Sequence, residues 1–373
     1  MALRLRVFGR KIRENLLAVF VAAFFFGIAF GLLILCSPET PKVKEEKPTD
    51  IRVTSVLVTE ELVSTPVTEV MEITQEPTEP TEKETEKPTR EIEPYPPLLK
   101  KKGFIITPQA CPEDLFLLII IVTSSRNFQA RKAIRKSWGE DNSKKNETSN
   151  ESFRVVYVVG SDDEHDRLVK RESKRYKDIL RGGFKDFYLK NEGHSVKVLF
   201  GLKWATTACK AKFVLKATDE SFVNTDELIS FLRKKNEDAN EGLYLGFCHG
   251  HDVGGAKVVR NEKSPWYISE EEWPENRLPP YASGMGIAIS YDVVEKIVDL
   301  SVKEKLIHID DVYLGIMANK LSLQCMDESN KFDTSYTTML TECEDMNFCV
   351  LGGVPPKDMY YLTQNIKNLK DIC

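Results

Sequence analysis

The first long apolar segment of the chain is Leu16–Cys36, which contains no charged residue. As a helix rising about 1.5 Å per residue, it would be roughly 30 Å long, the thickness of a bilayer's hydrocarbon core. The apolar region of a cleaved signal peptide is only about 7–15 residues long. We therefore expect an uncleaved transmembrane anchor at residues 16–36.

Basic residues precede this segment and set its expected orientation. They are Arg4, Arg6, Arg10, Lys11 and Arg13. Positively charged flanks stay on the cytosolic side of a membrane. Residues 1–15 are therefore expected to form a cytoplasmic tail, and the remainder to be luminal, as in a single-pass type II membrane protein.

Residues 37–102 are rich in Pro, Thr, Glu and Lys and almost lack aromatic side chains. Such a segment cannot bury enough apolar surface to offset the entropy lost on ordering it. We interpret it as a disordered luminal stem. Its composition is typical of an O-glycosylated stalk, although a bare flexible linker would hold the next domain away from the bilayer equally well.

Residues 103–373 have the apolar periodicities of a folded domain. Short apolar runs predict buried strands at 115–125, 153–160 and 212–220, and helical patterns occur at 128–138, 164–176, 195–209 and 226–235. Alternating buried strands and helices indicate an α/β fold with a largely parallel sheet. Ligands bind at the carboxyl ends of the strands of such sheets, and Asp219 and Glu220 lie at one of those ends.

Charge and cysteine content narrow the function classes. The net charge of −5 argues against a nucleic-acid partner, because nucleic-acid binders are usually strongly basic. Seven cysteines follow Cys36 in a compartment where disulfides persist. Because seven is odd, at least one is free or pairs with a second chain, which keeps a homodimer open.

Two further features are short polar motifs. Asn146 and Asn150 begin N-glycosylation sequons in a polar segment, and we expect both to accept glycans. His249 and His251 are two residues apart and would share one face of a strand. Two histidines without a third ligand are more typical of a polar surface than of a metal site.

Two acidic clusters are candidates for chemistry. The first is K-A-T-D-E-S-F-V-N (Lys216–Asn224), and the second is I-D-D-V-Y-L-G (Ile309–Gly315), which opens a helical pattern. Carboxylates at a strand end suit a hard divalent cation that also contacts phosphate oxygens, and another carboxylate can act as a general base. The alternative for the second cluster is an ordinary helix N-terminus, where acidic residues are favourable.

Ordered motifs resemble those of the β-1,3-galactosyltransferase and β-1,3-N-acetylglucosaminyltransferase family (glycosyltransferase family 31). The matching blocks are R-K-A-I-R-K-S-W-G (Arg131–Gly139), Glu172–Tyr188, Gly201–Cys209, K-A-T-D-E-S-F-V-N, W-Y-I-S-E-E-E-W-P (Trp266–Pro274), P-P-Y-A-S-G-M-G-I-A-I-S (Pro279–Ser290) and I-D-D-V-Y-L-G. Each block is weak alone, but together they follow the family's order over about residues 115–354.

The resemblance implies a GT-A glycosyltransferase fold, which is Rossmann-like, in a luminal catalytic domain at residues 103–373. It also implies a Golgi enzyme that uses a UDP-sugar and Mn²⁺. Such an enzyme transfers galactose or N-acetylglucosamine with inversion, in β-1,3 linkage, to a glycan acceptor on a glycoprotein or glycolipid.

The same resemblance assigns roles to single residues. Asp311 matches the general base, Glu220 the metal-coordinating acid, and Asp219 the acid beside the nucleotide sugar. Arg131 and Arg135 match basic positions near the UDP. The expected acceptor-binding residues are Asp310 and the aromatic residues Trp266 and Tyr281, whose rings suit packing on sugars.

Four positions depart from the family's pattern. Its acidic triplet D-D-D is Thr218-Asp219-Glu220 here, and Gly352 replaces the His of a C-terminal H-x-V-x-P pattern. Ala282 replaces the Cys of P-P-Y-C-S-G, so one family disulfide is expected to be absent or rearranged. Pro265 replaces the usual Lys before Trp-Tyr.

These departures leave three readings. The enzyme binds metal through Glu220 together with water and diphosphate, or it has reduced metal dependence. In the third reading it is a catalytically silent luminal protein with a binding or chaperone role.

Overall fold

In this computed structural model, the described residues are 103–140, 152–186, 193–238, 241–336 and 340–373. All belong to one compact unit, Thr85–Cys373. The predicted tail, anchor, stem and both sequons lie outside the described residues. Within these ranges, no helix is long and apolar enough to cross a membrane.

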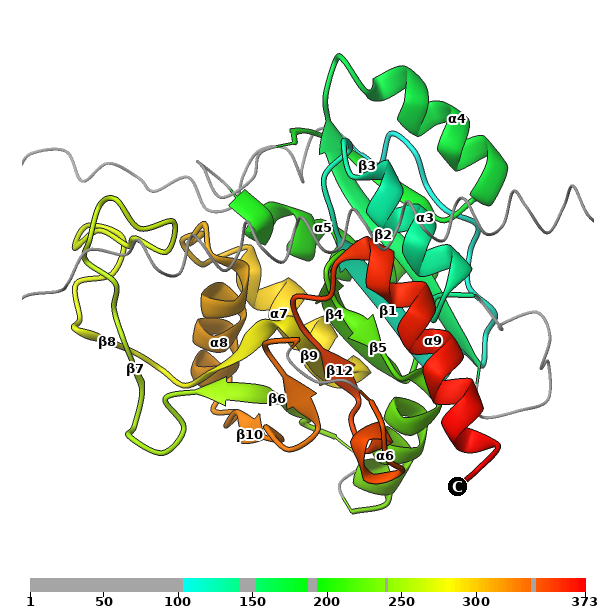
Figure 1. Ribbon diagram of the computed structural model, residues 1–373. Coiled ribbons are helices and arrows are strands. Elements are labelled where there is room, and N and C mark those ends of the chain that lie inside the picture. Colours follow the sequence, from blue (N-terminus) through cyan, green and yellow to red (C-terminus); the bar gives the residue numbers. More distant parts are fainter. Residues whose placement is uncertain (1–102, 141–151, 187–192, 239–240, 337–339) are drawn as a thin grey trace, which may run out of the picture. The chain divides into compact units, whose positions relative to one another are not determined.

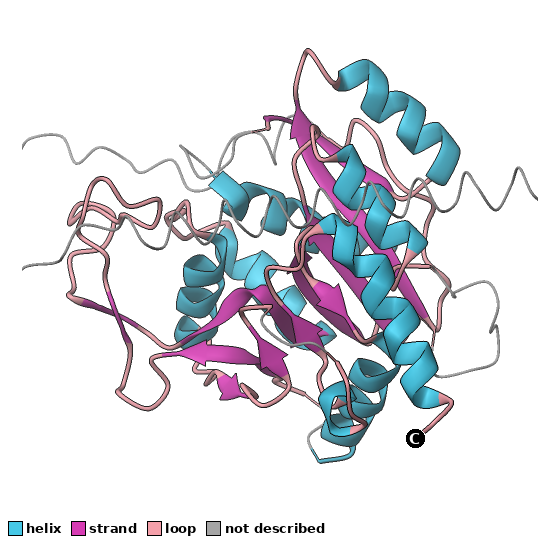
Figure 2. Cartoon of the chain, viewed as in Figure 1, coloured by secondary structure: helices cyan, strands magenta, loops and turns pink. Residues whose placement is uncertain are grey.

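A seven-stranded mixed sheet forms the centre of the domain (Figures 1 and 2), with the strand order β10-β6-β9-β4-β1-β2-β3. Its strands are β1 (Leu117–Val122), β2 (Phe153–Ser161), β3 (Ile179–Lys185), β4 (Phe213–Thr218), β6 (Tyr244–His249), β9 (Tyr281–Ser290) and β10 (Met326–Asp327). The pairs β1–β2, β1–β4, β2–β3 and β6–β10 are parallel, whereas β9 is antiparallel to both β4 and β6. The predicted α/β class and the three predicted strands are confirmed.

Helices cover both faces of this sheet because its central strands are apolar on both sides. Alternate residues of the fully buried β1 join two separate cores. Helices α5 (Gly193–Ala208), α7 (Tyr291–Ser301) and α8 (Asp310–Lys320) contribute to the core that contains Leu118. Helices α3 (Phe128–Lys136), α4 (Asp166–Tyr176), α6 (Thr225–Asp238) and α9 (Pro356–Lys370) contribute to the core that contains Leu117.

Short elements complete the domain. A three-stranded sheet contains β5 (Phe222–Val223), β11 (Phe332–Asp333) and β12 (Val350–Leu351), and β7 (Ala256–Lys257) pairs with β8 (Arg277–Leu278). A 3₁₀ turn, η1 (Glu344–Met346), precedes β12. The segment between β7 and β8 carries Trp266.

Disulfides account for six of the seven cysteines after the predicted anchor. They join Cys111 to Cys209, Cys248 to Cys325 and Cys343 to Cys373, and Cys349 is free and buried. The expectation that at least one cysteine remains unpaired within the chain is confirmed. Because Cys349 lies in the core, its thiol is in no position to pair with a second chain without local opening.

Candidate active site

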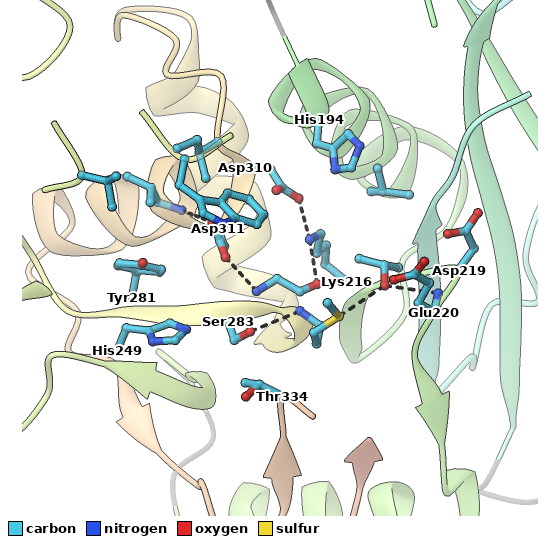
Figure 3. A pocket seen from close by; sticks show the side chains of 18 of the residues that line it. His194, Lys216, Asp219, Glu220, His249, Tyr281, Ser283, Asp310, Asp311 and Thr334 are labelled. Carbon is cyan, nitrogen blue, oxygen red and sulfur yellow. Dashed lines mark hydrogen bonds and ion pairs between the residues drawn. The ribbon is translucent and has the colours of Figure 1, made fainter. Parts of the chain in front are cut away.

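A cavity of about 380 Å³ opens where several elements of the main sheet end (Figure 3). The carboxyl ends of β1 and β4, which are parallel neighbours, line this cavity together with residues that follow them. The end of β6 and the beginnings of β9 and α8 also line it. Six predicted site residues line it: Asp219, Glu220, Trp266, Tyr281, Asp310 and Asp311. The cavity therefore lies at the carboxyl ends of β1 and β4, where the sequence predicts a ligand site.

The turn after β4 carries two carboxylates in different environments. Asp219 is buried, and its Oδ2 accepts hydrogen bonds from Thr123 Oγ1 at 2.5 Å and Asn127 Nδ2 at 2.8 Å. These bonds join the turn to the segment that follows β1. Glu220 is exposed, and its carboxylate has no hydrogen-bond or ion-pair partner among the described residues. Glu220 is therefore available to bind a cation.

The opposite side of the cavity holds a second acidic pair at the start of α8. Lys216 on β4 contacts Asp310 Oδ2 at 2.5 Å and donates a hydrogen bond to the carbonyl oxygen of Gly284 at 2.8 Å. The backbone N–H of Gly284 in turn donates to Asp311 Oδ2 at 3.0 Å. A Cβ atom at residue 284 would lie 2.9 Å from the Lys216 amine and 3.3 Å from Asp311 Oδ2. Glycine at this position therefore lets the lysine and the two acids meet.

Burial and charge separate the pKa values of these two acids. Burial raises the pKa of Asp311 to about 6, and the neighbouring Asp310 adds to that effect. Burial also acts to raise the pKa of Asp310, but the charge and hydrogen bond of Lys216 act against it, and that pKa lies below its usual value. Asp310 therefore stays ionised, while Asp311 can exchange a proton near neutral pH.

The raised pKa of Asp311 gives a testable pH dependence. A general base works as the carboxylate, so kcat/KM for a reaction in which Asp311 takes a proton should rise about tenfold per pH unit below pH 6 and level off above it. The measurement is kcat/KM from pH 5 to pH 8, with protein stability followed in the same buffers. A profile that stays flat between pH 5 and pH 7 would exclude Asp311, with this pKa, as the base.

The structure corrects the predicted position of the two arginines. Neither Arg131 nor Arg135 lines the cavity. The Arg131 guanidinium is fully buried, contacts both carboxylate oxygens of Glu172, and donates to the carbonyl oxygens of Ser124 at 2.5 Å and Ser125 at 3.1 Å. Its hydrogen bonds therefore fix the backbone of the segment after β1 without contributing to the cavity lining.

The contacts of Arg135 are with residues that do not line the cavity. It binds Asp178 through two nitrogens and Glu172 through a third, and it stacks on the rings of Tyr157 and Tyr176. Because its donors are committed to these carboxylates, we assign Arg135 a structural role. The sequence motif marked two important arginines but did not reveal that their partners come from α4 and the start of β3.

Aromatic and apolar side chains form the part of the cavity nearest the β7–β8 segment. Trp266 is 51% exposed, and Tyr281 lies with its ring centroid 5.0 Å from that of His249. His251 Nδ1 instead donates a hydrogen bond to the carbonyl oxygen of Cys248 at 2.8 Å, and its Nε2 lies 3.6 Å from Asp327 Oδ2. The two histidines therefore do not form a metal pair.

Met285 lies beside two positions that depart from the family's pattern near the expected metal site, Thr218 and Gly352. Its sulfur lies 3.6 Å from Thr218 Oγ1. A Cβ atom at Gly352 would lie 2.7 Å from Met285 Cγ and 2.8 Å from the carbonyl oxygen of Thr334. The wall beside Glu220 is therefore neutral, and a larger residue at position 352 would require the Met285 side chain and the backbone at Thr334 to move.

The chemistry of the cavity nevertheless fits a divalent cation. Among its described lining residues are four carboxylates, at Asp219, Glu220, Asp310 and Asp311, but only two lysines, Lys216 and Lys257. A diphosphate entering this negative cavity would require a compensating charge. Glu220 and Asp219 offer the oxygen ligands that Mn²⁺ and Mg²⁺ accept, and diphosphate and water would have to complete the shell.

Lys216 and His194 are among the cavity residues that sequence reasoning missed. Lys216 lies within a motif that we noted, and a lysine inside an otherwise buried strand was a usable signal of an ion pair. His194 lies at the start of α5 and had no comparable signal, because nothing in the sequence shows that this helix begins at the cavity.

Comparison with known proteins decides the family. The model of the galactosyltransferase family matches residues 129–329, which include all four acidic residues of the cavity. The chain belongs to the galactosyltransferase family. It is accordingly a glycosyltransferase of this family by descent, and the resemblance seen in the ordered motifs is confirmed.

Similar curated proteins agree with this family assignment. The galactosyltransferase-family chain is 29% identical to β-1,3-galactosyltransferase 1 of mouse and of human over 290 residues, which is 76% of this chain and 83% of those relatives. It is 27% identical to mouse β-1,3-galactosyltransferase 5 over 69% of this chain and 80% of that relative. The structure of residues 1–349 of S. aureus TarS aligns with a TM-score of 0.33 at 13% identity, over 58% of this chain and 59% of that one, too slight a likeness to bear on the fold.

Proposed function

We propose that this galactosyltransferase-family protein is an inverting β-1,3-glycosyltransferase with a GT-A fold. It would transfer galactose, or N-acetylglucosamine, from a UDP-sugar to a glycan acceptor. The observation that carries this proposal is the presence of Asp219–Glu220 and Asp311 on opposite sides of one cavity (Figure 3). Asp219 and Glu220 are suited to binding a diphosphate together with its cation. Asp311 is suited to taking a proton from an attacking hydroxyl.

In the proposed reaction, Asp311 accepts the proton of an acceptor hydroxyl as that oxygen forms a bond to the anomeric carbon. The bond from this carbon to the diphosphate oxygen breaks, and UDP leaves on the opposite face, so the configuration inverts. The N–H groups of Gly284 and Val312 hold the two carboxylate oxygens of Asp311. This fixed orientation favours proton transfer to one side of the cavity.

We further propose that Glu220, supported by Asp219, holds the catalytic cation, with Mn²⁺ as the first candidate. A bound divalent cation would offset the charge that develops on the departing diphosphate. Since the wall at Thr218, Met285 and Gly352 adds no charged ligand, we expect weak retention of Mn²⁺ in the absence of nucleotide. Calorimetric titration of Mn²⁺ with and without UDP measures this dependence, and equally tight binding in both cases would contradict it.

The acceptor is proposed to enter over Trp266 and Tyr281, near Asp310. Aromatic faces pack against the C–H faces of sugar rings, and the exposed face of Trp266 leaves room for such a contact. Trp266→Ala should raise the KM for the acceptor by about tenfold and change the KM for the donor by less than about twofold. Equal increases in both values would contradict an acceptor-specific role. Trp273→Ala, in the same β7–β8 segment but outside the cavity, is the control.

The cellular setting of this activity remains a proposal based on the sequence. Residues 16–36 would anchor the protein as a single-pass type II protein of the Golgi membrane, and residues 37–102 would hold the catalytic domain away from the bilayer. Acceptors would be glycans on glycoproteins or glycolipids, consistent with a role in protein glycosylation, and Asn146 and Asn150 would themselves carry N-glycans. We propose no nucleic-acid partner and leave a homodimer open to direct measurement of mass in solution.

Transfer from a panel of UDP-sugars by the purified protein, with Mn²⁺ and with EDTA, tests the proposed activity. We expect turnover with UDP-galactose or UDP-N-acetylglucosamine that falls strongly in EDTA. The neutral wall beside Glu220 favours one competing function, a catalytically silent luminal protein that retains the cavity for binding. Saturable UDP binding with no transfer to any acceptor would support that alternative over the enzyme.

A further inference from the structure

His194 occupies a central place in the cavity that the proposed mechanism does not use. It lines the cavity from the first turn of α5 and is only 9% exposed. Figure 3 shows its ring between Asp310 on one side and Asp219 on the other. Both of these acids, together with Lys216, are close enough to act electrostatically on the imidazole. His194 therefore lies near the acidic pair that contains the proposed base and also near the proposed diphosphate site.

The backbone on both sides of His194 is fastened to the segment that leads into α8. Ser195 Oγ donates a hydrogen bond to the carbonyl oxygen of Ile307 at 2.5 Å. Gly193 has a φ of +50°, and a Cβ atom there would lie 2.2 Å from the carbonyl oxygen of His308. Asp310 and Asp311 begin α8 just after this segment. The backbone that carries His194 is therefore fixed relative to the segment that leads to the proposed catalytic base.

Burial favours the uncharged form of this ring. Burial lowers the pKa of His194 to about 4, with Lys197 and Lys216 contributing, although Asp310 and Asp219 act in the opposite direction. A neutral imidazole has one N–H donor and one nitrogen acceptor. It is poorly suited to binding a diphosphate, which favours cations, but well suited to a sugar hydroxyl, which both donates and accepts.

Geometry also limits which part of the substrate lies beside this ring. If the diphosphate lies near Glu220 and the acceptor hydroxyl lies near Asp311, the anomeric carbon must lie between them. The transferred hexose then occupies the space that His194 borders. We propose that His194 recognises a hydroxyl group of the transferred hexose and thereby contributes to donor-sugar selection. This inference rests on the proposed function, because it uses the same donor and acceptor positions.

Binding measurements without acceptor separate this role from nucleotide binding. Affinities for UDP and for the UDP-hexose that the wild-type protein prefers are measured by calorimetry with Mn²⁺, for the wild type, His194→Leu and His194→Asn. We expect His194→Leu to weaken UDP-hexose binding by about 10- to 100-fold and UDP binding by less than about twofold. His194→Asn, which keeps a donor and an acceptor, should recover part of the loss.

Three outcomes would overturn the proposal. Unchanged UDP-hexose affinity in His194→Leu would exclude recognition of the sugar. Equal losses for UDP and UDP-hexose would assign His194 to the nucleotide or to the integrity of the site. Equal losses in the Leu and Asn variants would show that hydrogen bonding is not the cause. Absence of transfer from any UDP-hexose by the wild-type protein would instead refute the proposed function, so the two failures are distinguishable.

Discussion

Asp311→Asn should reduce kcat for transfer by at least about 10³-fold while changing UDP affinity by less than about threefold. The amide is nearly the same size as the carboxylate and can still accept the hydrogen bond from Gly284 N–H. It cannot take a proton from the acceptor hydroxyl, and a positioned general base contributes about 10²–10⁴-fold to such reactions. Initial rates with saturating donor, together with calorimetric UDP binding, measure both quantities.

A matched control for this substitution is Asp299→Asn. Asp299 is exposed on α7 and does not line the cavity, so its amide variant should keep wild-type turnover. Retention of more than about a third of wild-type kcat by Asp311→Asn would remove Asp311 from the role of base. Loss of UDP binding in parallel with activity would indicate damage to the site as a whole.

The second large effect concerns stability, and we expect it from Glu172→Ala. This change leaves the fully buried Arg131 guanidinium without its carboxylate partner, whereas Arg135 retains Asp178. Removing one partner of a buried ion pair typically costs about 3–5 kcal/mol, since the other charge remains desolvated and unpaired. Chemical denaturation of the purified variant should therefore show a free energy of unfolding lower by about this amount.

Lys170→Ala is the control for this change because Lys170 is exposed on the same helix, α4. It should alter the free energy of unfolding by less than about 0.5 kcal/mol. A loss below about 1 kcal/mol in Glu172→Ala would show that Arg131 finds another partner or water. That result would reopen a direct role for this arginine at the donor site.

Much of the fold could be predicted because its strands are buried on both faces. The continuous apolar run in β1 can be read locally, as can the helical pattern of α3. The position of Asp219 and Glu220 at a cavity also followed from the rule that parallel strands expose their carboxyl ends together. The antiparallel placement of β9 between β4 and β6 could not be read from its own residues, because strand pairing is a long-range choice.

Long-range contacts also explain which features of the site could not be predicted from the sequence. The motif R-K-A-I-R-K-S-W-G identifies Arg131 and Arg135 but not their acidic partners, of which Glu172 is 41 residues away from Arg131 in the chain. The changes at Thr218 and Gly352 looked independent in the sequence, yet Met285 contacts one and fills the space beside the other. Each of these features depends on side chains that only the folded chain brings together.

The most direct test of the central claim is the stereochemistry and linkage of the product. The purified protein is incubated with Mn²⁺, an acceptor glycan and the ¹³C-labelled UDP-hexose that it prefers, and the product is analysed by NMR spectroscopy. Our account predicts a β-configured sugar attached at O3 of the acceptor, formed by the wild type and not by Asp311→Asn. An α-configured product, or equal product formation by the Asp311→Asn variant, would contradict inverting transfer with Asp311 as the base.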